Sequence, residues 1–111
     1  MIGCGAKAEA LCTRLRTDLE AVRQAGLALP RRPRVYFEEW DEPMISGIGW
    51  VSELIGIAGG IDVFAELSGC KSAKDRIVTP EQVIRAKPDI VVGSWCGKKF
   101  APLKFAARPG F

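Results

Sequence analysis

Apolar residues recur at helical spacing near the start of the chain and predict a helix over Ala6–Ala25. Its apolar face carries Leu11, Leu15, Leu19 and Val22. Charged residues occupy the other positions, and Gly26 is expected to end the helix. A linker with two prolines and two arginines follows over residues 27–33.

Two short apolar runs, Arg34–Phe37 and Ile90–Val92, predict strands that are apolar on both faces, as in a sheet covered by helices. Helices are predicted between these strands, which gives a βαβ pattern with parallel strands and a right-handed crossover. The predicted fold class is therefore α/β, with a Rossmann-like parallel sheet. Two strands are too few for an independent sheet, so we expect the domain to be incomplete.

The first of these helices is predicted over Trp50–Ala58, capped by Ser46 or Gly49 and ended by the glycine pair at 59–60. A second begins at Thr79-Pro80-Glu81-Gln82. Threonine is its cap, proline occupies the first helical position, and glutamine completes a capping box. Residues 62–76 are expected to be irregular apart from one helical turn, and the chain after Gly97 is expected to be irregular.

Composition narrows the possible functions of the chain. Its 111 residues suit one domain, and its net charge of +3 is spread along the sequence, so a nucleic-acid partner is not expected. No apolar run approaches the roughly 20 residues that span a bilayer. The absence of histidine excludes Ser-His-Asp and Cys-His catalysis within this chain.

The four cysteines form no C-x-x-C pair. Neither a zinc site nor a disulfide framework is therefore expected, and no metal ligands are assigned. Cys12 is expected to pack on the first helix, and Cys70 is expected to be a loop thiol.

Both predicted strands end in polar and aromatic residues. The first continues as E-E-W-D-E-P, and the second as G-S-W-C-G. Ligands of α/β sheets bind outside the carboxyl ends of the strands, so we expect Trp40 and Trp95 to flank one opening, half of a ligand pocket. Indoles can lie against a flat macrocycle, and carboxylates can accept hydrogen bonds from ligand amides. The candidate ligand-binding residues are Glu39, Trp40, Asp41, Met44 and Trp95.

Nearby residues receive other assignments. The pleat of the strand sends Glu38 to the side opposite Glu39. Trp50, at a helix start, is expected to lie in the core of the lobe. Lys98 and Lys99 are expected to be solvated.

Four strings of residues resemble one family of transport proteins. They are R-V-Y-F-E-E-W-D-E-P-M-I-S-G, E-L-I-G-I-A-G-G-I-D-V-F, V-T-P-E-Q-V-I-R-A-K-P-D-I-V-V and S-W-C-G-K-K. The chain resembles the periplasmic substrate-binding proteins of ABC importers for cobalamin and ferric siderophores, the helical-backbone metal-receptor group. The resemblance implies two α/β lobes joined by a long helix, with ligand between the lobes. Residues 1–27 are then the end of the connecting helix, and residues 28–111 a partial C-terminal lobe.

The family resemblance also implies a function and partners. The protein would capture cobalamin or a related metal chelate in the periplasm or at the cell surface, together with an N-terminal lobe absent from this chain. Glu81 matches the position of a glutamate that docks on the membrane permease. The acidic strand end favours amide-rich or cationic ligands over anionic ferric siderophores, and therefore favours cobalamin. No cofactor is implied.

Two alternatives stay open from the residues themselves. Glu39 and Asp41 could be an acid–base pair in a fragment of an α/β enzyme. The chain could also be a plain interaction or structural domain that binds no chelate.

Overall fold

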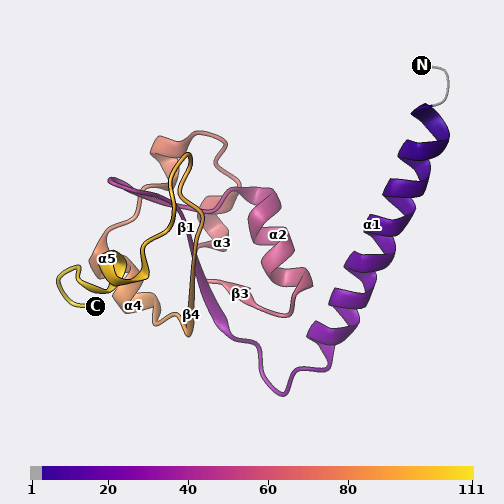
Figure 1. Cartoon of the computed structure of the whole chain (residues 1–111). Helices are drawn as coiled ribbons and strands as arrows, with labels where there is room; N and C mark the ends of the chain where they lie inside the picture. Colours follow the sequence, from indigo (N-terminus) through magenta and orange to yellow (C-terminus); the bar gives the residue numbers. More distant parts are fainter. Residues whose placement is uncertain (1–3) are drawn as a thin grey trace.

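The computed structural model describes residues 4–111 of the chain. Its elements in order are α1 (Cys4–Leu27), β1 (Arg34–Asp41), β2 (Met44–Ser46), α2 (Gly49–Ile57), β3 (Ile61–Asp62), α3 (Ala65–Ser68), the 3₁₀ helix η1 (Ala73–Arg76), α4 (Pro80–Ala86), β4 (Ile90–Gly93) and α5 (Pro102–Ala106). A small lobe holds everything after α1, and α1 extends away from that lobe (Figure 1).

β1 is the centre of a four-stranded mixed sheet. It pairs in parallel with β4 over Val35–Glu38 and with β3 at its first two residues. The predicted parallel relation between the two apolar strands is therefore confirmed. β1 runs four residues further than the sequence indicated, and its end pairs antiparallel with β2. Glu42 and Pro43 connect the two strands of this β1–β2 hairpin.

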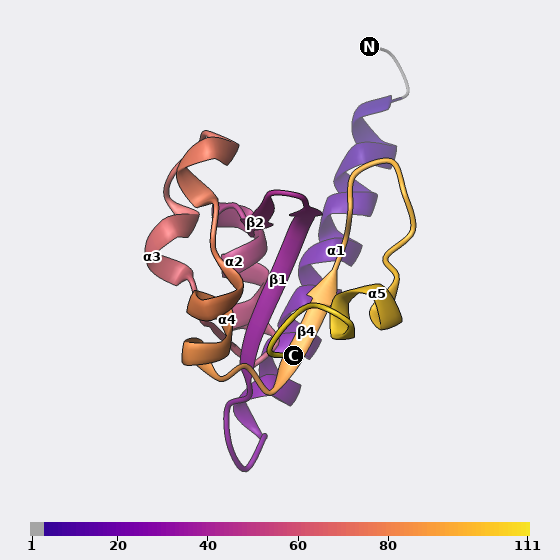
Figure 2. The same ribbon diagram turned by 90° about the vertical axis from the view of Figure 1, so that its left-hand side faces the viewer.

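The two faces of β1 are covered by different helices. The main core lies on the face of Tyr36 and contains Tyr36, Met44, Phe64, Val78, Val83 and Phe105. Figure 2 shows α3 and α4 on one side of β1 and α5 in front of β4. The opposite face meets α2, whose Val51 is buried. Alternate residues of β1 therefore enter two separate apolar layers, as the pleat requires.

The predicted start of α4 is confirmed. The Thr79 hydroxyl accepts a hydrogen bond from the Gln82 backbone N–H, and the Gln82 side chain accepts one from the Thr79 N–H. The predicted cap of α2 is wrong, because Ile48 is its N-cap residue and makes no side-chain bond. The Ser46 hydroxyl instead donates to the Arg76 carbonyl. Neither β2 nor α5 was expected from the sequence.

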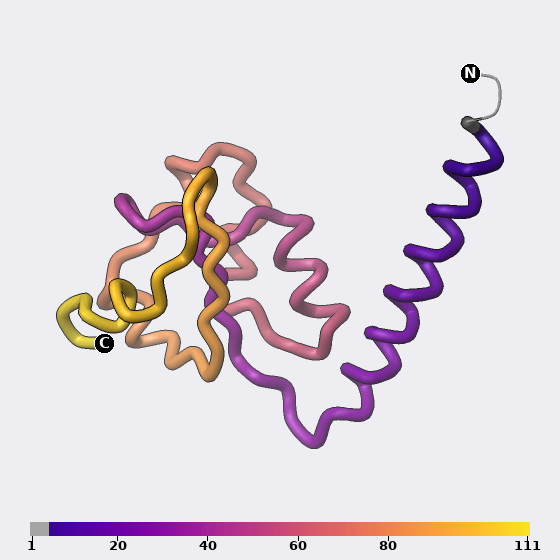
Figure 3. The backbone as a smooth tube through the Cα atoms, in the orientation of Figure 1, coloured from indigo at the N-terminus to yellow at the C-terminus, as the bar shows by residue number. Residues whose placement is uncertain are grey.

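The apolar stripe of α1 is exposed along its whole length. Its members are Leu11, Leu15, Leu19 and Val22. Cys12 is exposed as well, so its expected packing role is wrong for this structure. The backbone trace shows α1 approaching the lobe at its C-terminal end only (Figure 3). The helix predicted from periodicity is thus present, but the lobe leaves its apolar face uncovered.

Two glycines form the joint between α1 and the lobe. A Cβ atom built on Gly26 would lie 2.8 Å from the backbone of Ala58 and Gly59. A Cβ on Gly59, whose φ is +94°, would lie 2.8 Å from the Gly26 Cα. Gly26 thus lies inside α1 as a contact residue, and the expectation that it ends the helix is wrong. The helix and the lobe meet backbone to backbone, which side chains would prevent.

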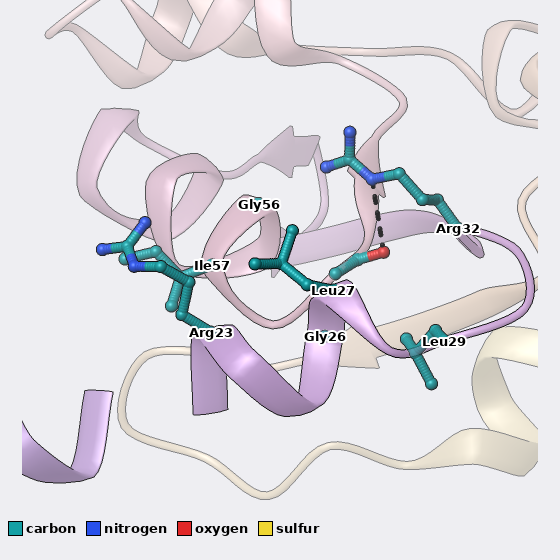
Figure 4. Close-up of a pocket in the computed structure, with 8 residues that line it drawn as sticks. Arg23, Gly26, Leu27, Leu29, Arg32, Gly56 and Ile57 are labelled. Carbon is teal, nitrogen blue, oxygen red and sulfur yellow. Dashed lines mark hydrogen bonds between the residues drawn. The ribbon is translucent and has the colours of Figure 1, made fainter. Parts of the chain in front are cut away.

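Arg32 reinforces this joint. Its guanidinium donates to the carbonyls of Gly59 and Gly60, the latter at 2.8 Å. Figure 4 shows Arg32 and Gly26 on the same small hollow, with Leu27 between them. Since these carbonyls belong to the turn just after α2, Arg32 ties the linker after α1 to the lobe.

The joint predicts opposite effects for two alanine substitutions. Gly26 and Gly56 are each the next-to-last residue of a helix, but a Cβ on Gly56 has no neighbour within 4 Å. Gly26→Ala should destabilise the full-length protein by about 1–3 kcal/mol through the backbone clash and lower its Tm by several degrees. Gly56→Ala should be neutral or stabilising by up to about 1 kcal/mol. Equal Tm values for the two variants, measured by calorimetry, would contradict the close backbone contact at Gly26.

Candidate ligand-binding site

The carboxyl ends of β1 and β4 lie side by side, since Glu38 is paired with Gly93 (Figure 2). Trp40 and Trp95 follow from these two ends. The Lys98 ammonium lies 4.6 Å from the centre of the Trp40 ring and 5.2 Å from that of Trp95. The two indoles therefore share one end of the sheet, around a single lysine. They differ in access to solvent, because Trp40 is half-buried and Trp95 is buried.

Trp95 is buried because it hydrogen-bonds a buried carboxylate. Glu38 is fully buried and accepts from the Tyr36 hydroxyl at 2.9 Å and from the Trp95 indole N–H at 2.8 Å. Arg108 adds a bidentate pair, at 2.7 and 3.1 Å. Burial raises the pKa of the Tyr36 hydroxyl, and the neighbouring Glu38 charge raises it further. Tyr36 is thus held as a neutral donor to the carboxylate.

Glu39 points to the other face, as the pleat predicted. Its carboxylate accepts from Arg76 at 2.6 Å. Arg76 is itself buried and also donates to the carbonyls of Cys70 and Ser46. The pairing register with β2 shifts between Glu38 and Trp40, which is a bulge of the kind that re-aims side chains. Glu39 therefore has a structural partner already.

Asp41 has two partners. Its Oδ2 atom accepts from the Lys98 ammonium at 2.9 Å and from the Lys104 ammonium at 3.2 Å. The hydrogen bond from Lys98 is the largest cause that lowers the pKa of Asp41 to about 2. The carboxylate is therefore ionised at neutral pH. Lys98, expected to be solvated, instead pairs with Asp41, and no ion pair of Lys99 is present within residues 4–111.

Two tryptophans have the opposite exposure to solvent from that expected from the sequence. Trp95, a candidate ligand contact, is only 5% exposed and packs edge-on against Phe100, with ring centres 4.9 Å apart. Trp50, expected in the core, is 65% exposed at the start of α2, so that expectation is wrong. Met44 lies in the main core with Tyr36. Direct ligand contact by Trp95 and Met44 stays a prediction, and in this packing both offer little surface.

A hollow of about 270 Å³ opens beside the strand ends, on the α2 side. Glu39 is the one predicted residue in its lining. The other lining residues are Phe37, Ile48, Trp50, Val51, Ser94 and Cys96. The sequence did not single out most of these lining residues, although Phe37 lies two residues before Glu39 in β1 and must share its face. Ser94 and Cys96 flank Trp95, so the same alternation that buries the indole turns them outward.

The described residues limit the chemistry of this end. No group of three or more potential ligands that could hold a metal ion occurs in residues 4–111. Cys12, Cys70 and Cys96 are free thiols. No helix in the same range is both long and apolar enough to cross a membrane. The arrangement provides aromatic surface and half-exposed ammonium groups at one edge, which suits non-covalent binding.

Comparison with known proteins places these features in a family. No curated protein sequence matches the chain. Among solved structures, the chain is similar to the periplasmic heme-binding protein RhuT from Roseiflexus sp. RS-1 in apo form, with 25% identity and a TM-score of 0.65. The similarity covers 83% of this chain and 35% of that one, so the chain spans about a third of the length of its structural relative.

A family model described as periplasmic binding protein matches residues 1–111. This is a family of binding proteins and not of enzymes, so the acid–base enzyme reading of Glu39 and Asp41 is wrong. The geometry agrees, since Glu39 is held by Arg76 and Asp41 is held by Lys98 and Lys104. With the whole length matched and a parallel-sheet lobe that ends in aromatic residues, the chain belongs to the periplasmic binding protein family.

Proposed function

We propose that this chain forms part of the solute-binding component of an ABC importer, which captures a metal chelate of the tetrapyrrole class between two lobes and delivers it to a permease. Cobalamin is the ligand favoured by the sequence motifs, and heme is the one named for the similar structure. Residues 1–27 would be the end of the connecting helix and residues 28–111 part of the C-terminal lobe. The working compartment would be the periplasm or the cell surface.

One observation supports this proposal above the others. The adjacent carboxyl ends of β1 and β4 bring the half-buried Trp40 ring beside the half-exposed Lys98 ammonium. In open α/β sheets this edge is where ligands bind. A flat indole offers apolar contact to a macrocycle, and the neighbouring charge can orient its polar rim.

The uncovered surfaces of the chain support the two-lobed arrangement. The apolar stripe of α1 and the sheet residues Ile90 and Val92 are exposed. Val35, Ile90 and Val92 line an open apolar hollow with Leu29. Apolar surface of this kind is usually covered in a folded protein, and the missing lobe and strands of a two-lobed protein would supply that cover.

The candidate residues then take different roles. Trp40 would contact the ligand directly. Glu39 and Asp41, each held in an ion pair, would lie at the border of the site. Trp95 and Met44, which are buried, would support it from the core. Glu81 would act outside the ligand site, at the docking surface for the permease.

Titration of the full-length protein tests ligand capture. Cyanocobalamin, hemin and a ferric siderophore should be compared by tryptophan fluorescence, and one of the two tetrapyrroles should give saturable quenching without turnover. Quenching by the siderophore alone would contradict the tetrapyrrole class, and quenching by none of the three would contradict chelate capture.

The same titration tests the role of Trp40. Stacking on an aromatic ring is worth about 0.5–1.5 kcal/mol beyond its buried area, so Trp40→Ala should weaken affinity by roughly tenfold. Trp40→Phe keeps an aromatic face and is the matched control, because both variants lose the indole bond to the Glu42 carbonyl. The control should keep most of the affinity. Equal losses in both variants would point to that hydrogen bond and not to stacking.

Charge reversal tests the docking role of Glu81, which is exposed in the first turn of α4. Electrostatic pairs set orientation and association rate more than affinity. Glu81→Arg should therefore slow uptake severalfold in a reconstituted importer while the ligand Kd stays unchanged. Glu66, an exposed acidic residue in the first turn of α3, provides the control Glu66→Arg. Transport unchanged by Glu81→Arg would refute the docking role.

A further inference from the structure

Two ammonium groups share one carboxylate oxygen at the strand ends. Lys98 and Lys104 both donate to Oδ2 of Asp41, at 2.9 and 3.2 Å. The Asp41 side chain is 2% exposed, whereas the side chains of Lys98 and Lys104 are 40% and 58% exposed. One buried negative charge thus faces two half-exposed positive charges. This cluster carries an excess of one positive charge at the surface.

No other carboxylate of the described chain neutralises that excess. Glu38 is paired with Arg108, and Glu39 is paired with Arg76. The ion pairs formed by Lys98 and Lys104 in residues 4–111 are those with Asp41. The pKa of Asp41 is lowered, chiefly by the hydrogen bond from Lys98, so its charge is already present at neutral pH. Both ammonium groups therefore keep donor capacity for an anionic group of a ligand.

The two lysines are also held in place. The Lys98 ammonium lies over the Trp40 and Trp95 rings, and the Lys104 ammonium lies 5.7 Å from the centre of the Trp95 ring. Cation–π contacts of this kind hold an ammonium group without neutralising its charge. Lys98 is thus held over the Trp40 ring, and Lys104 is held near it by their shared partner Asp41. A ligand that lies on this indole brings its rim within reach of both ammonium groups.

From this geometry we propose that Lys98 and Lys104 form an anion-binding position, which takes a carboxylate or phosphate arm of the chelate that lies on Trp40. The proposal rests on the proposed function, because it takes the strand ends as the ligand-binding edge. It adds a selection rule to that function. Chelates with an anionic arm are preferred over otherwise similar chelates that lack one.

This rule reverses an argument based on the sequence. The run of carboxylates at the end of β1 favoured cationic or amide-rich ligands, but Glu38, Glu39 and Asp41 are each held in an ion pair, while Glu42 is exposed. Beside Asp41, the groups that keep access to solvent are Lys98 and Lys104. The charge that a ligand meets at this position is therefore positive.

Matched pairs of ligands test the rule in the full-length protein. Hemin carries two carboxylates, and its dimethyl ester carries none. Cyanocobalamin carries a phosphodiester, which dicyanocobinamide lacks. Dissociation constants should be measured for the wild type, for Lys98→Ala and Lys104→Ala, and for Lys99→Ala as the control. Each of the first two variants leaves Asp41 one partner, so the fold should be retained.

The expected result is a loss of roughly tenfold in affinity for the anionic member of whichever pair binds, in both Lys98→Ala and Lys104→Ala. The neutral member should bind the wild type more weakly and should be little affected by either substitution. Lys99→Ala should behave as wild type. The hemin pair identifies a carboxylate arm, and the cobalamin pair identifies a phosphate arm. Equal affinity within a pair, or equal losses for both of its members, would overturn the anion-binding position.

A second probe separates this proposal from the proposed function. If neither tetrapyrrole binds, the proposed function fails, and inorganic phosphate can still test the lysines. Phosphate titrated at low ionic strength should shift the Trp40 indole N–H resonance in the wild type and in Lys99→Ala. The shift should be lost in Lys104→Ala, which leaves Lys98 on Asp41. No shift in the wild type would also overturn the anion-binding position.

Discussion

The buried carboxylate of Glu38 is the constraint on which the end of this lobe depends. A buried charge is costly unless it is paired and fully hydrogen-bonded. Glu38 meets this requirement with Tyr36, Trp95 and both terminal nitrogens of Arg108. These donors come from β1, from the loop after β4, and from the segment after α5. The chain after β4 is therefore held against β1 by one carboxylate as well as by apolar packing.

Two other acidic residues of the strand end also form ion pairs. Glu39 holds Arg76 from η1, and Asp41 holds Lys98 and Lys104. Each carboxylate thus recruits a basic residue that lies far along the sequence. At this edge the Trp40 ring is half-buried, and the two lysines are half-exposed. Neutralisation inside the lobe and the ligand recognition proposed outside it would both follow from the same ion pairs.

The joint between α1 and the lobe rests on a different interaction. Gly26 and Gly59 allow the two backbones to touch, and Arg32 binds the carbonyls of Gly59 and Gly60 just after α2. No side chain separates the two backbones at this point of the joint.

Local patterns determined much of this fold. Apolar periodicity identified α1, the capping box identified the start of α4, and two apolar runs identified β1 and β4, because each of these signals acts between residues close in sequence. The pleat alone was enough to separate Glu38 from Glu39. The motifs, read as a family resemblance, also indicated the family that the comparisons then showed. The carboxyl ends of two parallel strands place Trp40 and Trp95 at one edge, as expected, but Trp95 is buried there and does not flank an opening with Trp40.

Tertiary structure decided which of these side chains reach solvent. The sequence placed Trp50 in the core and Trp95 at the ligand, whereas Trp50 is exposed and Trp95 is buried. The deciding partners of Trp95 are Glu38, 57 residues away, and Phe100. Likewise, nothing local indicates that Lys98 and Lys104 converge on Asp41. Sequence determined where charge and aromatic rings occur along the chain, but only folding decided their pairing, because burial and ion pairing join residues that the sequence keeps far apart.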